Sequence, residues 1–167
     1  GIEFLANCWA DPSGLSLCLA NEELFWGDAG IGLSIMGTSL AVAAIYASGT
    51  PDQLVEWVPQ CFGDESEPAV AAFCSTEPEA GSDVSAMRTR ARYDEATDEW
   101  VIEGEKAFIT NSGTPITSII TVTARTGPGE ISAIVVPAGT PGLTVAPPYR
   151  KMGWHASDTH GRTFSDC

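Results

Sequence analysis

The middle of the chain reads Phe73-Cys74-Ser75-Thr76-Glu77-Pro78-Glu79-Ala80-Gly81-Ser82-Asp83, where a short apolar run ends. This stretch gathers the hydroxyls of Ser75, Thr76 and Ser82 around a proline and Gly81. Such a composition lets a loop turn sharply and present backbone N–H groups to a polar or anionic ligand. Composition alone also suits an ordinary turn after a strand. Both interpretations therefore remain open for this loop.

A second stretch reads Lys106-Ala107-Phe108-Ile109-Thr110-Asn111-Ser112-Gly113 and sets an aromatic ring beside a hydroxyl at the end of a predicted strand. A flat, conjugated ligand needs an aromatic surface next to hydrogen-bonding groups. This stretch is therefore a candidate binding segment. The alternative is that Phe108 lies in the core and residues 110–113 form a turn.

A third stretch reads Lys151-Met152-Gly153-Trp154-His155-Ala156-Ser157-Asp158-Thr159. His155 and Asp158 are residue types that carry acid–base catalysis, but no nucleophile lies near them in the sequence, so we predict no catalysis there. The five cysteines form no CxxC pair and have no histidine-spaced partner. The sequence therefore predicts neither a disulfide framework nor a metal site.

The first third of the chain predicts helices. Apolar residues recur at helical spacing in residues 15–26, and the apolar residues 30–47 are numerous enough to form a buried helix. A further helix begins after Thr50, a residue type suited to the N-cap. Pro51 takes the first helical position and Gln53 the capping-box position.

Two-residue alternation replaces the helical spacing beyond residue 67. We therefore predict a domain boundary there, with a helical part at residues 1–67 and a β domain at residues 68–167. The predicted strands are residues 69–74, 87–93, 100–109, 118–125, 131–137, 143–146 and a last strand from Arg162. The predicted fold class is α+β: a helical segment followed by a small antiparallel β-barrel.

The charge of the chain argues against some classes of partner. Eight Lys and Arg residues stand against 22 Asp and Glu residues, which gives a net charge of −14 over 167 residues. A chain this acidic is a poor electrostatic partner for nucleic acid or for an anionic membrane. We also expect no membrane span, because residues 37–39 break the longest apolar run before it reaches the roughly 20 residues that a bilayer requires.

Taken in this order, the three stretches resemble the acyl-CoA dehydrogenase family. Thr76-Glu77-Pro78-x-Ala80-Gly81-Ser82-Asp83 is similar to the family's flavin-binding signature. Gly104-x-Lys106-x-Phe108-Ile109-Thr110-Asn111 is similar to its second flavin segment. The third stretch, with Phe164-x-Asp166, resembles the run that closes the family's middle β domain. The resemblance extends from about Glu22 to Cys167.

The resemblance implies an FAD enzyme that oxidises an acyl-CoA thioester to the trans-2-enoyl-CoA. A carboxylate would remove the α-proton while the β-hydride passes to flavin N5, and an electron-transfer flavoprotein would then accept the electrons. The residues implied around FAD are Phe73, Ser75, Thr76, Gly81, Ser82, Phe108, Ile109 and Thr110. Ser82 would also lie near the thioester substrate.

Several positions depart from the family pattern. Phe108 stands where most relatives have Trp, and Glu79 occupies a place often held by Gly. A carboxylate near a cofactor phosphate would repel it, so we predict that Glu79 points to solvent. His160, Gly161 and Arg162 stand where relatives usually have a basic residue, an acidic residue and Leu. We therefore predict imperfect packing of the last strand.

The resemblance places the catalytic glutamate on a C-terminal helical domain that this sequence lacks, so we assign no catalytic residue. The chain is then interpreted as a fragment whose full-length form is a homo- or hetero-oligomer. Two alternatives remain: a non-catalytic flavin-binding or assembly module that works with a partner chain, and a related flavin monooxygenase. The expected location is the cytoplasm, or the mitochondrial matrix in a eukaryote.

Overall fold

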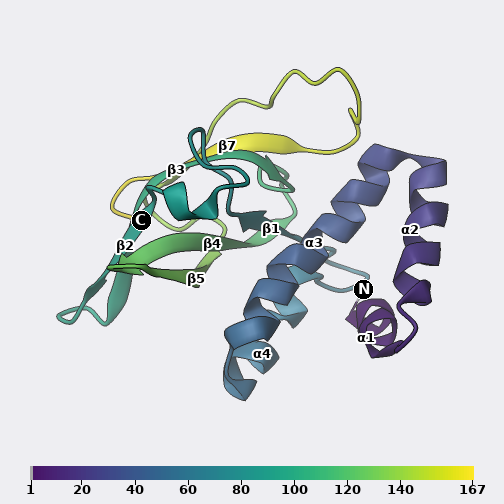
Figure 1. Cartoon of the computed structure of the whole chain (residues 1–167), viewed down its shortest axis with the longest axis horizontal. Helices are drawn as coiled ribbons and strands as arrows, with labels where there is room; N and C mark the ends of the chain where they lie inside the picture. The colour runs from purple at the N-terminus through teal and green to yellow at the C-terminus, as the bar shows by residue number, and fades with distance from the viewer. Residues whose placement is uncertain (1) are drawn as a thin grey trace.

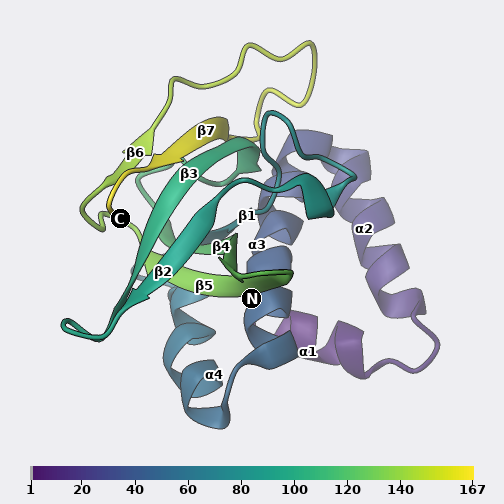
Figure 2. The same cartoon turned by 60° about the vertical axis from the view of Figure 1, so that its left-hand side comes forward.

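The computed structural model describes residues 2–167, in which helices precede strands (Figure 1). Figures 1 and 2 show the helices gathered on one side of the molecule and the strands on the other, with α3 beside the sheet. The helices are α1 (Ile2–Ala10), α2 (Leu15–Gly27), α3 (Ala29–Ser48), α4 (Pro51–Trp57) and the short 3-10 turns η1 (Pro59–Cys61) and η2 (Val84–Ala86). The helices predicted at residues 15–26, at residues 30–47 and after Thr50 are confirmed, whereas α1 is an addition.

Local capping explains where α3 and α4 begin. The Asp28 carboxylate accepts the Ile31 N–H at 2.9 Å and so caps α3. The predicted capping box of α4 is present in full: the Thr50 hydroxyl accepts the Gln53 N–H, and the Gln53 side chain accepts the Thr50 N–H at 2.9 Å. These bonds satisfy N–H groups that would otherwise lack partners at a helix start.

Helix α3 corrects one expectation about the sequence. Residues 37–39, expected to break the apolar run, lie within this 20-residue helix, which is long and apolar enough to cross a membrane by length and composition. The core helix of a folded domain meets the same criteria. Here α3 packs on the sheet, where its Thr38 hydroxyl accepts the Ala71 N–H at 3.2 Å.

The strands form one mixed sheet. They are β1 (Val70–Cys74), β2 (Arg90–Asp94), β3 (Glu99–Thr110), β4 (Thr117–Gly127), β5 (Glu130–Pro137), β6 (Leu143–Val145) and β7 (Thr159–Phe164). Their order is β1-β4-β2-β3-β7-β6, and β5 pairs with β4. The pairs β2–β3, β4–β5, β3–β7 and β6–β7 are antiparallel, as predicted, but β1 runs parallel to β4.

The predicted β-barrel is wrong, because the sheet is not closed. A barrel requires the two ends of the strand order to pair with each other. Here β1 pairs with β4 at one end and β6 pairs with β7 at the other, and no pairing joins β1 to β6 within residues 2–167. Strand alternation predicts that a sheet has a buried face, but it carries no information about closure.

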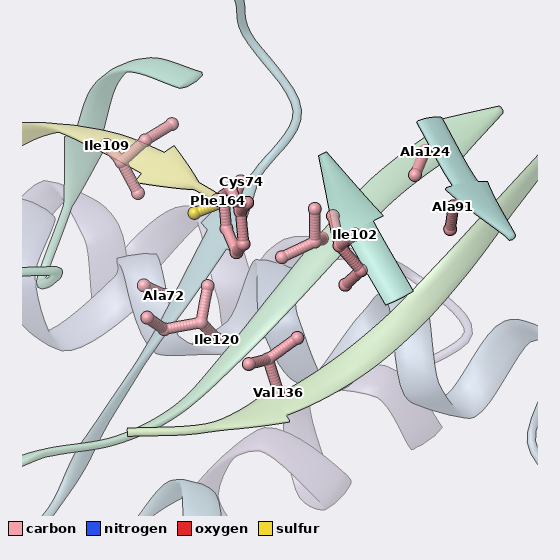
Figure 3. Close-up of a cluster of buried hydrophobic side chains, with 10 residues drawn as sticks. Ala72, Cys74, Ala91, Ile102, Ile109, Ile120, Ala124, Val136 and Phe164 are labelled. Carbon is pink, nitrogen blue, oxygen red and sulfur yellow. The ribbon is translucent and has the colours of Figure 1, made fainter. Parts of the chain in front are cut away.

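Two apolar clusters hold these layers together. The cluster in Figure 3 lies among the strands and contains Ala72, Cys74, Ala91, Ile102, Ile109, Ile120, Val122, Ala124, Val136 and Phe164. The second joins α3 to the sheet through Ala41, Val42, Ile45, Cys61, Ala71 and Ile119. The helical segment and the strands therefore share a packed interface.

Asn111 adds a polar bond across that interface. It follows β3 in a left-handed conformation, with φ at 60°, and its side chain is 1% exposed. Its side-chain amide donates to the Ser34 carbonyl of α3 at 2.7 Å and to the Ala71 carbonyl of β1 at 3.4 Å. One buried side chain thus connects α3 with β1 at the end of β3.

We expect Asn111→Ala to lower the free energy of unfolding by about 3 kcal/mol, because it leaves buried carbonyls without donors and puts alanine in a left-handed conformation. Urea denaturation of the chain measures this loss. Asn7→Ala is the control, since Asn7 is exposed on α1, and its effect should stay within about 0.5 kcal/mol. Equal effects of the two substitutions would contradict the role given to Asn111.

Candidate functional site

The loop at residues 73–83 is anchored by a buried ion pair. The Lys106 ammonium of β3 lies 2.9 Å from a Glu77 carboxylate oxygen, and the two side chains are 0% and 4% exposed. The same carboxylate accepts the Arg88 N–H at 2.7 Å and the Thr89 N–H at 2.9 Å. Glu77 therefore fixes the loop to β3 and to the segment that leads into β2.

The ionisation of this pair follows from its contacts. Burial raises the pKa of Glu77, but hydrogen bonds from Thr89, Arg88 and Lys106 outweigh burial and bring that pKa below its ordinary value of 4.5. Burial lowers the pKa of Lys106, against the hydrogen bond and charge of Glu77. The carboxylate is consequently ionised at neutral pH and has no free oxygen for acid–base work.

Further hydrogen bonds join the loop to the segment at residues 106–113. The Ala107 N–H donates to the Thr76 carbonyl at 2.8 Å, and the Lys106 ammonium donates to the Ser75 carbonyl at 3.1 Å. The Ser75 hydroxyl lies 3.2 Å from the hydroxyl of Thr123 on β4. Two stretches that the sequence analysis selected separately are thus one connected structure.

Phe108 projects from a bulge in β3. The β3–β7 pairing shifts register between Lys106 and Ile109, and Phe108 has a φ of 59°. Its side chain is 64% exposed while the neighbouring Ile109 is buried. Left-handed backbone is unfavourable for a bulky residue, and bulges re-aim side chains near functional sites. The interpretation of Phe108 as a core residue is therefore wrong.

The loop between β6 and β7 covers Phe108 from one side; it arches away from the sheet at the yellow-green end of the chain in Figure 1. The Tyr149 ring stacks on the Phe108 ring with centroids 4.8 Å apart. A pocket beside them is lined by Leu33, Phe108, Thr110, Lys151, Gly153, Trp154 and Thr159. Three hydrophilic or aromatic side chains of this loop, Tyr149, Lys151 and Trp154, were not selected as site residues from the sequence.

The predicted residues do not all meet in that pocket, which Phe108 and Thr110 line and the other six do not. Phe73, Ser75 and Thr76 are half-buried, Ile109 is buried, and Gly81 and Ser82 are exposed. Glu79 is exposed, as predicted. Within residues 2–167 the hydroxyls of Thr76, Ser82 and Thr110 make no hydrogen bond, so each can bind a ligand.

The acidic and sulfur-containing side chains give no sign of a metal site. Residues 2–167 contain no group of three His, Cys, Asp or Glu side chains placed to hold a metal ion. The Cys74 thiol is fully buried, and burial raises its pKa to about 12. Cys74 is therefore a core residue and not a nucleophile.

The ion pair gives a testable dependence of stability on pH. At pH 7 we expect Glu77→Gln to lower the free energy of unfolding by about 3–5 kcal/mol, because it leaves the Lys106 charge buried without a partner. The pKa of Glu77 is lowered in the folded chain, so on acidification the unfolded chain takes up this proton first. The stabilisation by the carboxylate is thus complete above about pH 4.5 and is lost as the pH falls further.

Denaturation of both proteins between pH 7 and pH 3 measures this difference, which should shrink toward the acid end. Glu79→Gln is the matched control, because Glu79 lies two residues away and is exposed. A difference between wild type and Glu77→Gln that stays constant over this range would show that the carboxylate charge has no role.

Comparisons with known proteins agree with this arrangement. Residues 72–167 match the family model "Acyl-CoA dehydrogenase, middle domain". The probable medium-chain specific acyl-CoA dehydrogenase 2 of Caenorhabditis briggsae is 35% identical over 159 residues, which are 91% of this chain and 37% of that protein.

Solved structures give the same result. The butyryl-CoA dehydrogenase of Megasphaera elsdenii is 35% identical with a TM-score of 0.79, covering 91% of this chain and 39% of that one. A glutaryl-CoA dehydrogenase of Mycobacterium smegmatis in complex with FADH2 is 34% identical with a TM-score of 0.80. The match covers 92% of this chain and 39% of that chain. The chain thus spans less than half the length of these relatives. By its sequence and its fold, the chain belongs to the acyl-CoA dehydrogenase family.

Proposed function

We propose that this chain is the flavin-holding part of an FAD-dependent acyl-CoA dehydrogenase that oxidises an acyl-CoA thioester to the trans-2-enoyl-CoA. The observation that carries the proposal is the exposed Phe108 ring on its left-handed bulge, beside the unbonded Thr110 hydroxyl. A ligand with a flat face and polar edges would use both groups together.

The residues present fit FAD. Phe108 offers an aromatic face, and the loop at residues 73–83 offers unbonded hydroxyls at Thr76 and Ser82. The glutaryl-CoA dehydrogenase relative was solved with the reduced form of this cofactor. We assign FAD contacts to Phe73, Ser75, Thr76, Gly81, Ser82, Phe108, Ile109 and Thr110. When bound, FAD supplies the acceptor for a hydride from the β-carbon of the acyl chain.

The residues of this chain have positioning roles in that reaction. Phe108 would stack against the ring system, and the hydroxyls of Thr76 and Thr110 would donate hydrogen bonds to its polar edge, which would favour the electron-rich state. Ser82 lies near the thioester. The Glu77–Lys106 pair holds the backbone that carries these groups and does not itself touch the ligand.

The α-proton requires a base that this part of the protein does not supply. The three carboxylates of the loop are not placed as that base: Glu77 is buried and fully hydrogen-bonded, Glu79 is exposed, and Asp83 caps η2 by accepting the Ser85 N–H at 3.1 Å. The proposal therefore places the catalytic carboxylate outside residues 2–167 and regards the chain as part of a longer enzyme.

The remaining features of the proposal concern organisation and partners. Residues 1–67 would be the end of a helical domain and residues 68–167 the middle β domain, with the oligomer formed by the full-length protein. An electron-transfer flavoprotein would accept the electrons. The relatives include proteins named as mitochondrial and a bacterial protein, which supports a location in the mitochondrial matrix or the cytoplasm.

Titration of the chain with excess FAD tests the proposal, with the shift of the visible flavin absorption band as the readout. We expect Phe108→Ala to weaken FAD binding by about tenfold, since stacking on an aromatic ring contributes about 0.5–1.5 kcal/mol beyond the area that it buries. Tyr46→Ala is the matched control: Tyr46 is 65% exposed on α3 and outside the pocket, so FAD binding should not change.

Two results would contradict the proposal. One is an absorption band that does not shift at any FAD concentration, either with this chain or with the full-length protein. The other is equal binding by wild type and Phe108→Ala, which would show that the bulge does not face the flavin. Circular dichroism of each variant checks that the fold is retained.

A further inference from the structure

His160 on β7 lies between two oxygen acceptors. Its Nδ1 is 2.7 Å from the Ala146 carbonyl, and its Nε2 is 2.6 Å from a carboxylate oxygen of Asp158. The side chain is 9% exposed, so water does not replace these partners. A neutral imidazole has one N–H and one bare nitrogen, and a bare nitrogen facing either oxygen would oppose two lone pairs. Only the doubly protonated ring donates to both.

Asp158 makes a second contact, with the turn that follows β3. Its other oxygen accepts the Gly113 N–H at 2.7 Å, at the turn that follows β3. Gly113 also has no room for a side chain, because a Cβ there would lie 2.2 Å from His160 Nε2. The imidazole therefore packs directly on the backbone of the segment at residues 106–113.

These contacts join three separate parts of the site: the end of β6 at Ala146, the end of the loop at Asp158 and the turn at Gly113. The group formed by His160, the Ala146 carbonyl and the Asp158 carboxylate is called the His160 clasp below. The clasp closes the loop at residues 146–158, because it holds a residue at each end. That loop carries Tyr149, which stacks on Phe108.

We infer that His160, as a doubly protonated imidazolium, is a positioning residue that fastens the loop at residues 146–158 and thereby holds Tyr149 against Phe108. Its effect on the flavin rests on the function proposed above, whereas its effect on the loop does not. Tyr149 is placed by its N–H, which donates to the Thr159 carbonyl at 3.0 Å. Loss of the clasp frees the carbonyl of Ala146 and leaves the Asp158 charge without its partner.

Other charged groups near the clasp do not replace His160. Within residues 2–167 it is the one cation in ion-pair distance of Asp158. Lys151 donates to the Ser157 carbonyl and to the Thr159 hydroxyl at 2.9 Å. Arg162 lies two residues further along β7, with its buried Nε unbonded. The charge of Asp158 also acts on Arg162, but of these groups only His160 contacts both the Asp158 carboxylate and the Ala146 carbonyl.

The first test measures the ring nitrogens of the wild-type chain. The chain has only two histidines, and the exposed His155 contacts the Lys151 carbonyl through one nitrogen. Long-range ¹H–¹⁵N correlation at pH 7, assigned with His155→Gln, should show both nitrogens of His160 protonated. A bare nitrogen on His160 would overturn the inference. This measurement needs no change at His160 and is valid even if variants there fail to fold.

The second test measures amide hydrogen exchange at Tyr149. We expect His160→Gln to speed exchange there by about tenfold, because glutamine cannot donate to both acceptors with a positive charge. His160→Arg keeps the charge and several donors, so it should restore most of the protection. His155→Gln, a change in the same loop, should leave exchange unaltered. The Ile120 amide in the core of β4 reports whether each variant is folded.

The outcomes separate the clasp from the proposed function. If amide exchange at Tyr149 is unchanged in a folded His160→Gln variant, the inference about the clasp is overturned. The inference is also overturned if His160→Arg and His160→Gln lose the same amount of protection at Tyr149. If the clasp results hold but wild type does not bind FAD, the proposed function fails and the clasp stands. If the clasp results hold and the wild type also binds FAD, His160→Gln should weaken the flavin absorption shift, as we expect for Phe108→Ala.

Discussion

The buried contact between Lys106 and Glu77 is the constraint on which the rest of the site depends. Neither charge has access to water, so each is stabilised only by its partner and by backbone groups. Those backbone groups are the Ser75 carbonyl and the N–H groups of Arg88 and Thr89, which lie in separate segments. A stable ion pair therefore requires the loop, β3 and the entry to β2 to be in place together. This coupling brings the stretches at residues 73–83 and 106–113 into one site.

Backbone strain is concentrated beside that pair. Phe108 and Asn111 both adopt left-handed conformations, which are costly for a bulky residue such as Phe108. Each is held by neighbouring contacts: the ion pair precedes Phe108, and the Asn111 amide bonds to α3 and β1. The helical segment thus supports the strained turn after β3 as well as covering the sheet. An aromatic ring that points outward at Phe108 is the result of this support.

The sequence predicted the features that depend on near neighbours. The Thr50 capping box, the three helix positions and the β2–β3 hairpin are decided by residues near one another in the sequence, and the structure reproduces them. Closure of the sheet and the parallel pairing of β1 with β4 depend on segments far apart, so periodicity gave the α+β class but not these two features. The same limit applies to the site. Phe108 was found from its own surroundings, but the stacking of Tyr149 depends on a loop that folds back over it.

The distribution of charge explains how so acidic a chain can accommodate an anionic ligand at this site. Of its eight basic residues, Lys151 lines the pocket of Phe108, whereas the charge of the buried Lys106 is already paired with Glu77. Surface carboxylates that lie far from the site repel a bound anion only weakly, because salt screens their electrostatic interaction beyond about 8 Å at physiological ionic strength. A phosphate or a reduced ring bound beside Phe108 would interact mainly with cations at short range, where screening is weak. The placement of Lys151 in the pocket would therefore matter more for binding than the net charge of −14.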